Sequence, residues 1–104
     1  MKVRAANGRL VYAPAGATDL DRLRELESAF RRWALSIESN DHLVVVFTPR
    51  GFAAALAEAI DESKHPHVLA TMAGDNTILV VPAAGVSAPA LRDELSRHLL
   101  EGVA

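Results

Sequence analysis

Two short stretches of this sequence are apolar at every position, and they constrain the fold more than any other feature. They cover residues 43–47 and 78–81 and are rich in β-branched side chains. A strand in a sheet covered on one face alternates apolar and polar residues, whereas these stretches have two faces that must leave water. We expect central strands whose second face is covered by another copy of the chain, by the hairpin that contains Trp33, or by the first helix.

The patterns around these stretches predict three helices. Apolar residues recur at helical spacing over residues 18–31 and 50–63, and a last helix follows Ser87, which is a suitable N-cap. Its buried stripe is Leu91, Leu95 and Leu99. The long apolar helix faces require a layer against which they pack.

Two further strands complete the predicted sheet. Residues 33–38 alternate in polarity and precede the turn cluster before the stretch 43–47, while residues 67–72 precede a tight turn before residues 77–81. After the first helix the order is therefore ββαββα. The fold class that we expect is α/β, as an α+β two-layer sandwich with a four-stranded, mainly antiparallel sheet, an extra N-terminal helix and a short N-terminal hairpin.

Composition excludes several classes of protein. The chain has 104 residues, which is one domain's worth, with 11 basic and 13 acidic residues for a net charge of −2. A free-standing nucleic-acid binder normally has a basic surplus. The absence of cysteine excludes disulfides and thiolate metal sites, and no apolar run approaches the ~20 residues that span a bilayer. We expect a cytoplasmic protein without a membrane partner.

The four histidines are the main candidates for metal or catalytic chemistry. His65 and His67 form an H-x-H pair that could begin a metal site, but no third ligand has convincing spacing. They flank Pro66, so we expect a solvated loop, no metal and no cofactor. No nucleophile elbow, P-loop or dinucleotide motif is present either, and the chain is predicted not to be an enzyme.

The sequence from residue 68 to residue 81 resembles the strand–turn–strand motif of bacterial arginine repressors, (I/V)-(L/V)-G-T-I-(A/C)-G-D-D-T-I. Residues 48–51, Thr-Pro-Arg-Gly, and the helix that reaches Asp61 are similar to that family's T-x-P-G…D segment. The N-terminal hairpin around Asn7-Gly8 resembles the wing that ends the family's DNA-binding domain. We therefore divide the chain into a wing remnant with linker, residues 1–16, and an oligomerisation and effector-binding domain, residues 17–104.

The resemblance implies a regulator of arginine metabolism. Proteins of this family have an N-terminal winged helix-turn-helix domain that binds operator DNA and a C-terminal domain that trimerises, two trimers stacking into a hexamer. L-Arginine binds between the trimers as corepressor. This chain resembles the C-terminal domain, so the implied partners are further copies of itself and L-arginine, with operator DNA reached only through a winged-helix part that these residues lack.

The resemblance also implies the ligand-binding residues. Asp75 and Asn76 occupy the two aspartate positions of the turn, and Asp61 matches the aspartate of the preceding helix. Thr71 and Ala73 match positions that offer backbone groups. A sixth residue, Ala54, stands where the family often has glutamine.

Asn76 and Ala54 depart from the family pattern, and they leave other functions open. Exchanging a carboxylate for an amide removes half of the negative charge of the turn, which weakens its attraction for a guanidinium. The chain could therefore assemble without an effector or prefer a less cationic amino acid such as citrulline. Because these residues lack a DNA-binding half, the chain could instead act as an interaction module in mixed hexamers with a full-length repressor. A pterin dehydratase shares the general architecture, but its chemistry needs clustered histidines, which the sequence does not show.

Overall fold

The computed structural model describes residues 19–101, with side chains described for residues 20–97. The wing-like hairpin predicted over residues 1–14 and the stripe residue Leu99 lie outside these ranges. Three helices and four strands follow one another in the order α-β-β-α-β-β-α. Their bounds are α1 Asp19–Trp33, β1 Ser36–Ser39, β2 Val44–Phe47, α2 Ala53–Ser63, β3 Val68–Ala73, β4 Thr77–Pro82 and α3 Ala88–Glu101.

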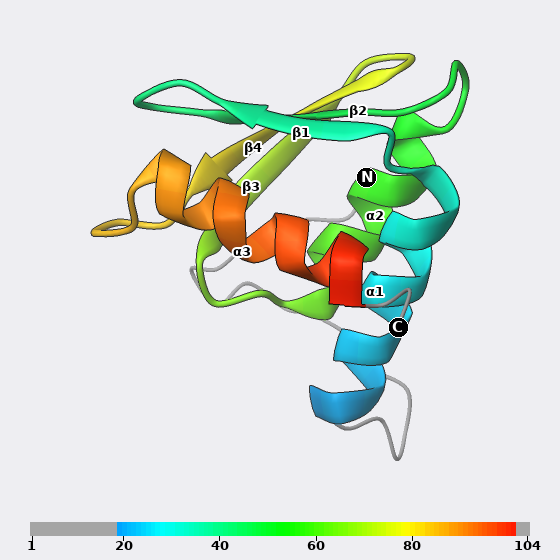
Figure 1. Ribbon diagram of the computed structural model, residues 1–104, viewed down its shortest axis with the longest axis horizontal. Coiled ribbons are helices and arrows are strands. Elements are labelled where there is room, and N and C mark those ends of the chain that lie inside the picture. The colour runs from blue at the N-terminus through cyan, green and yellow to red at the C-terminus, as the bar shows by residue number, and fades with distance from the viewer. Residues whose placement is uncertain (1–18, 102–104) are drawn as a thin grey trace.

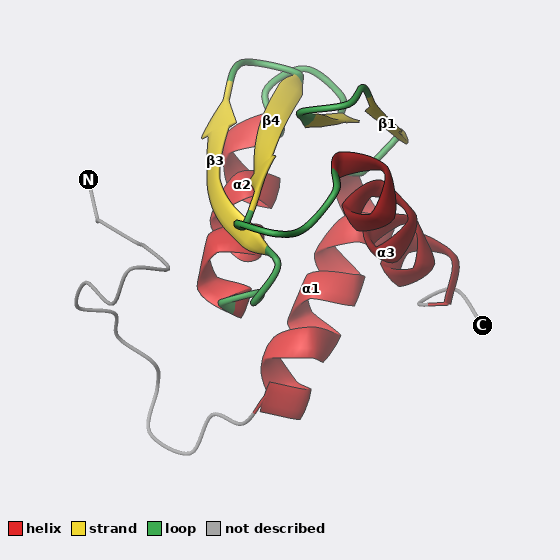
Figure 2. Ribbon diagram, turned by 90° about the vertical axis from the view of Figure 1, so that its left-hand side faces the viewer, coloured by secondary structure: helices red, strands yellow, loops and turns green. Residues whose placement is uncertain are grey.

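The four strands form one antiparallel sheet in the spatial order β1-β2-β4-β3. The three helices lie together on one side of it, as Figures 1 and 2 show from two directions. The predicted α+β two-layer fold is therefore confirmed. The two apolar stretches are the central strands β2 and β4, which pair with each other through Val44 and Val80 at one end and Phe47 and Thr77 at the other.

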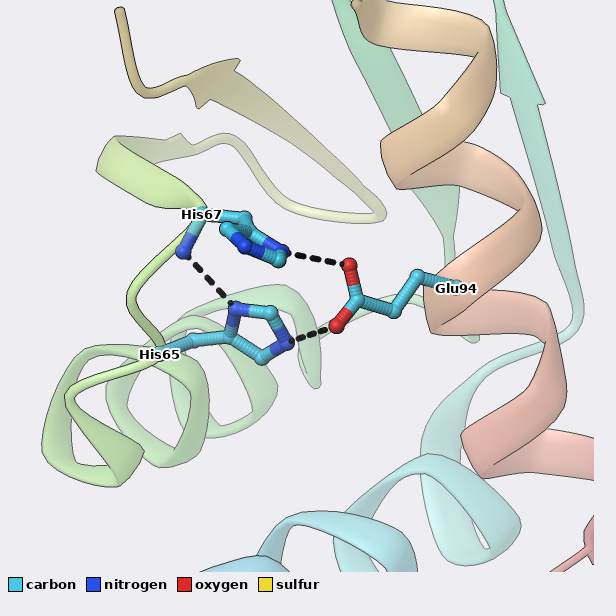
Figure 3. A group of neighbouring side chains, drawn as sticks. All are labelled: His65, His67 and Glu94. Atoms are coloured by element: carbon cyan, nitrogen blue, oxygen red, sulfur yellow. Dashed lines mark hydrogen bonds and ion pairs between the residues drawn. The ribbon is translucent and has the colours of Figure 1, made fainter. Parts of the chain in front are cut away.

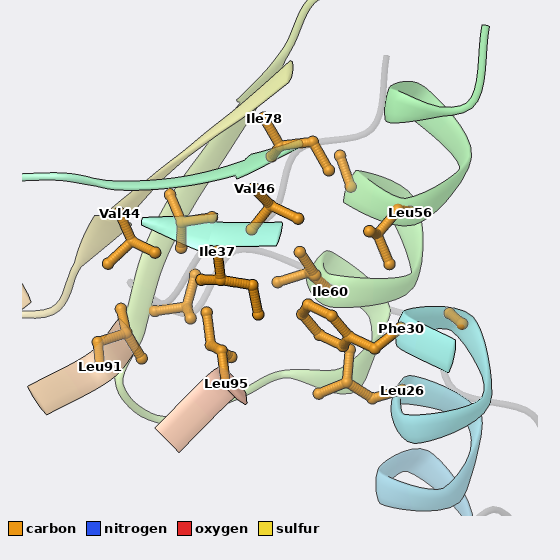
Figure 4. Close-up of a cluster of buried hydrophobic side chains, with 14 of the residues drawn as sticks. Leu26, Phe30, Ile37, Val44, Val46, Leu56, Ile60, Ile78, Leu91 and Leu95 are labelled. Atoms are coloured by element: carbon orange, nitrogen blue, oxygen red, sulfur yellow. The ribbon is translucent and has the colours of Figure 1, made fainter. Parts of the chain in front are cut away.

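The core lies between the sheet and the helices (Figure 4). Strands β2 and β4 alternate in burial, so that Val44, Val46, Ile78 and Val80 face the helices and are fully buried. Burying a side chain of this size contributes about 1.5–3 kcal/mol each relative to leaving it exposed. The helices supply the opposing side chains Leu26, Phe30, Leu56, Ile60, Leu91 and Leu95.

The segment before β1 differs from the prediction. The alternation of residues 33–38 was expected to form a strand beginning at Trp33, but α1 continues through Trp33 and β1 begins at Ser36. Leu26, Phe30 and Trp33 are also at helical spacing, and the partly buried Trp33 packs against the core. The Trp33 ring also stacks on the Phe52 ring at a centroid distance of 6.2 Å. Both contacts favour Trp33 as the last residue of α1 over a place in the strand.

The second face of the sheet is apolar and exposed. Register places Val45, Leu79 and Met72 side by side across three strands, on the face opposite Val44 and Val80. Met72 is 70% exposed. Among the described residues neither predicted intramolecular cover is present, because the β1–β2 hairpin is part of the sheet and α1 packs against α2 and α3 in the helical layer.

The described part of the chain contains no helix that is both long and apolar enough to cross a membrane.

Candidate functional site

The turn between β3 and β4 carries the acidic residue predicted to bind the ligand. Gly74 donates its backbone N–H to the carbonyl oxygen of Thr77 over 2.7 Å, which closes a tight turn around Asp75 and Asn76. The Thr77 hydroxyl donates to the Asn76 side-chain oxygen at 3.1 Å. Asp75 and Asn76 are both exposed, so the turn presents a carboxylate and an amide to the surroundings.

This turn is fastened to the loop that precedes α2. The backbone N–H of Gly51 donates to the Asp75 carbonyl oxygen at 2.9 Å and to its carboxylate Oδ1 at 3.0 Å. The backbone N–H of Thr48 donates to the carbonyl oxygen of Asn76 at 2.9 Å. Gly51 has φ +85°, a left-handed conformation that glycine adopts without steric cost. The sequence Thr-Pro-Arg-Gly therefore builds a loop whose backbone holds the acidic turn.

The same contact caps the start of α2. Phe52 occupies the N-cap position and makes no side-chain capping bond, but the Asp75 carbonyl oxygen accepts the N–H of Ala53 at 3.4 Å. The carboxylate of Asp75 lies beside this helix end, because its Oδ1 accepts the N–H of Gly51. The helix dipole makes the N-terminal end partly positive and so stabilises an anion there. Ala54, in the first turn of α2, is exposed near this place.

Asp61 and Thr71 form a second group. The Thr71 hydroxyl donates to Asp61 Oδ1 at 2.8 Å, and both side chains are partly buried. The helix ends soon afterwards, where Lys64 adopts the left-handed conformation with φ 54° and donates its N–H to the Asp61 carbonyl oxygen. The hydrogen bond from Thr71 to Asp61 connects the end of α2 to the middle of β3.

The six predicted ligand residues therefore do not converge within one copy of the chain. Asp75, Asn76, Ala54 and the neighbouring Ala73 lie by the N-terminal end of α2, whereas Asp61 and Thr71 lie by its C-terminal end. Ala53 and Asp61 are eight positions apart, which corresponds to roughly 12 Å along the helix axis. Within one copy, Asp75 and Asp61 therefore lie toward opposite ends of α2.

A third cluster was not predicted from the sequence. His65 and His67 flank Pro66 after α2, and both face Glu94 of α3 (Figure 3). His65 Nε2 lies 3.2 Å from Glu94 Oε2, and His67 Nδ1 lies 2.8 Å from Glu94 Oε1. The expected solvated loop is wrong for His65, whose side chain is only 7% exposed.

Comparison with known proteins identifies the family. The family model "Arginine repressor, C-terminal domain" matches residues 30–97, which include all six predicted ligand residues and most of the two-layer fold. The chain belongs to the arginine repressor family. This membership confirms the resemblance drawn from the strand–turn–strand motif and from the segment that ends at Asp61.

Individual arginine repressors match over most of the chain. The arginine repressor of Acetivibrio thermocellus is 34% identical over 97 residues, covering 93% of this chain and 63% of that protein. That of an Anaeromyxobacter species is 41% identical over 93 residues, covering 89% and 56%. That of Thermus thermophilus is 33% identical over 102 residues, covering 97% and 62%. The chain thus spans less than two thirds of the length of each of these arginine repressors.

Membership also bears on the question of enzymatic activity. The relatives are named repressors, which are regulators and not enzymes, and the expectation that the chain is not an enzyme agrees with the family. Of the histidines whose side chains are described, folding brings His65 and His67 within a ring-centroid distance of 5.5 Å, while His42 lies apart in the β1–β2 turn.

Proposed function

We propose that this chain is the oligomerising, effector-binding part of a cytoplasmic transcriptional regulator of arginine metabolism, with L-arginine as its corepressor. The observation that carries the proposal is the exposed Asp75 carboxylate, which the Gly51 backbone holds beside the start of α2. Operator DNA would be bound by a winged-helix part of the protein outside these 104 residues. The net charge of −2 agrees with a part of the protein that does not itself bind DNA.

The charge of arginine suits the acidic turn. Its guanidinium matches a carboxylate in geometry as well as in charge. A close ion pair at about 4 Å contributes about 4 kcal/mol at an effective dielectric constant of ~20, before the cost of desolvation. Asp75 supplies that carboxylate, and the Asn76 amide beside it offers an oxygen that accepts a hydrogen bond.

The separation of the two aspartates supports a site between copies. Asp75 is hydrogen-bonded at the N-terminal end of α2, whereas Asp61 belongs to the last turns of that helix. A bound arginine therefore joins copies when it contacts carboxylates of both. Such a ligand also offsets the repulsion between the acidic turns of neighbouring copies, which explains how a small cation can favour assembly.

The apolar face of the sheet supports self-association. Its exposed large side chains are Phe47, Leu69, Met72 and Leu79. Monomers rarely expose contiguous apolar patches of this kind, and burial against another copy removes them from water. We further propose that three copies form a trimer and that two trimers form a hexamer.

Light scattering during an arginine titration tests this function. The expected result is a trimer that becomes a hexamer as L-arginine rises to millimolar concentration, together with binding heat in calorimetry. Lysine is the matched control, because it has the same charge but lacks the planar fork of the guanidinium. No heat and no mass change with arginine on a folded oligomer would contradict corepressor binding.

A second candidate function rests on Asn76 and Ala54. The turn has one carboxylate where the family pattern has two, so the chain could oligomerise without an effector or bind a neutral amino acid such as citrulline. The same titration separates the candidates. A hexamer in the absence of any ligand, or one that forms with citrulline and not with arginine, favours this alternative.

A further inference from the structure

The cluster of His65, His67 and Glu94 joins two elements that are distant in the sequence. Both histidines belong to the segment between α2 and β3, while Glu94 lies in the middle of α3. Figure 3 shows the two imidazole rings directed at the two oxygens of one carboxylate. The Glu94 side chain is 27% exposed and the His67 side chain 48%, so the cluster is accessible from one side and buried on the other at His65.

The hydrogen bonds fix the protonation of His65. The backbone N–H of His67 donates to His65 Nδ1 at 3.1 Å, so this nitrogen carries a lone pair. The neutral ring then carries its proton on Nε2, which faces Glu94 Oε2. His65 therefore donates to one oxygen of the Glu94 carboxylate, and His67 Nδ1 lies 2.8 Å from the other.

The three side chains lie close enough together to bind one ion. One donor atom from each of the three residues lies within 4.8 Å of the others. Metal–nitrogen and metal–oxygen bonds of about 2.0–2.2 Å with tetrahedral geometry put neighbouring ligand atoms roughly 3.3 Å apart. The ring nitrogens lie at hydrogen-bond distances, 3.2 and 2.8 Å, from the two different oxygens of Glu94, so an ion would replace these two contacts.

We propose that His65, His67 and Glu94 bind a divalent transition-metal ion of the zinc class. Two imidazoles and one carboxylate are a ligand set that Zn²⁺ accepts with a fourth position left for water or another ligand. The ion links α3 to the segment between α2 and β3. In that segment, His65 comes four positions after Asp61. This inference is independent of the proposed corepressor function.

Binding requires a defined proton shift. The ion takes the lone pair of His65 Nε2, so the ring proton moves to Nδ1, and the backbone N–H of His67 loses its hydrogen bond to that nitrogen. His67 binds the ion through Nδ1 with its ring proton on Nε2. Neutral rings release no proton in this exchange, whereas a protonated ring releases one.

The test uses the full chain without an affinity tag, stripped of metal by a chelator and titrated with Zn²⁺ in a calorimeter. The expected result is one ion per chain. Co²⁺ serves as a second probe, because its visible absorption changes when imidazole and carboxylate replace water. The ring nitrogen shifts of His65 in NMR report the proton shift independently.

The variants are His67→Gln and Glu94→Gln, with His42→Gln as the matched control. His42 is exposed in the β1–β2 turn, outside the cluster. Loss of even an outer-shell partner costs about 10–100-fold in metal affinity, so each ligand variant is expected to lose at least that much while His42→Gln keeps the affinity of the original chain. His67 is half exposed, and thermal melts without metal verify that its variant is folded.

Three results would overturn the proposal. The first is the absence of both binding heat and a Co²⁺ spectral change. The second is equal affinity of the original chain and both folded ligand variants, which means adventitious binding only. The third is unchanged NMR shifts of the His65 ring on saturation with Zn²⁺.

Discussion

The backbone N–H of Gly51 is shared between the carbonyl oxygen and the carboxylate Oδ1 of Asp75, at 2.9 and 3.0 Å. The two residues are 24 positions apart in the sequence. This contact fixes the position and the orientation of the carboxylate before any ligand arrives. An acceptor that is already oriented loses less conformational entropy on binding, so a rigid turn favours affinity.

Replacing Asp75 by asparagine separates the charge of this group from its structural role. Asp75→Asn keeps a side-chain oxygen that accepts the Gly51 N–H but removes the negative charge. We expect the arginine affinity in calorimetry to fall by about tenfold or more, which corresponds to ~1.4 kcal/mol, with a nearly unchanged melting temperature. Asp41→Asn, in the exposed β1–β2 turn, is the control, and an equal loss there would point to a general charge effect.

Restoring the family pattern tests the two departures. The double variant Ala54→Gln, Asn76→Asp adds a second carboxylate to the turn and a side-chain amide to the first turn of α2. We expect arginine to bind more tightly and hexamer formation to need less of it, because a guanidinium is attracted by each added carboxylate. Light-scattering mass against arginine concentration is the measurement. An unchanged midpoint would show that these two positions are not ligand contacts.

Adding a side chain at Gly51 strains the loop that holds Asp75. Gly51→Ala has open space around the new Cβ, but its φ of +85° is unfavourable for an L-residue. Strain of this kind costs about 1–3 kcal/mol, so the melting temperature should fall by several degrees. Gly74→Ala is the matched control, since its Cβ would meet the Thr77 carbonyl oxygen at an ordinary 3.7 Å. A larger fall for Gly74→Ala than for Gly51→Ala would contradict this account.

A charge on the open face of the sheet should prevent self-association. Met72→Lys places an ammonium beside Val45 and Leu79, so burying this face against another copy requires burying an unpaired charge. We expect the light-scattering mass to fall toward a single copy, while far-ultraviolet circular dichroism stays unchanged because Met72 is exposed in the folded chain. Leu20→Lys, at the exposed start of α1, is the control. An oligomer that survives Met72→Lys would place the contact elsewhere.

The strand and helix patterns could be predicted because they depend on neighbours in the sequence. The fully apolar stretches became β2 and β4, and the predicted Ser87 cap accepts the Ala90 N–H at 3.1 Å. The error at Trp33 has a physical cause, because this residue belongs both to the alternating pattern of residues 33–37 and to the helical spacing that includes Leu26 and Phe30. The longer helical register from Leu26 decided the outcome.

Contacts between distant segments could not be predicted in this way. No local pattern relates His67 to Glu94, which is 27 residues away, and the search for a third ligand near the histidines failed for that reason. The resemblance named Asp75 and Asp61 as site residues, but only the fold shows that they lie toward opposite ends of α2. Their relation is a property of packing and not of spacing along the chain.

The length of α2 has a consequence for how this domain can vary. One additional residue within the helix would move Asp61 by about 1.5 Å and rotate it by roughly 100° around the axis relative to Ala54. The Asp61 carboxylate would then point away from the Thr71 hydroxyl, and the hydrogen bond that joins α2 to β3 would be lost. The length of these eleven residues is therefore fixed by contacts at both ends of the helix, with Asp75 at the first end and Thr71 at the last.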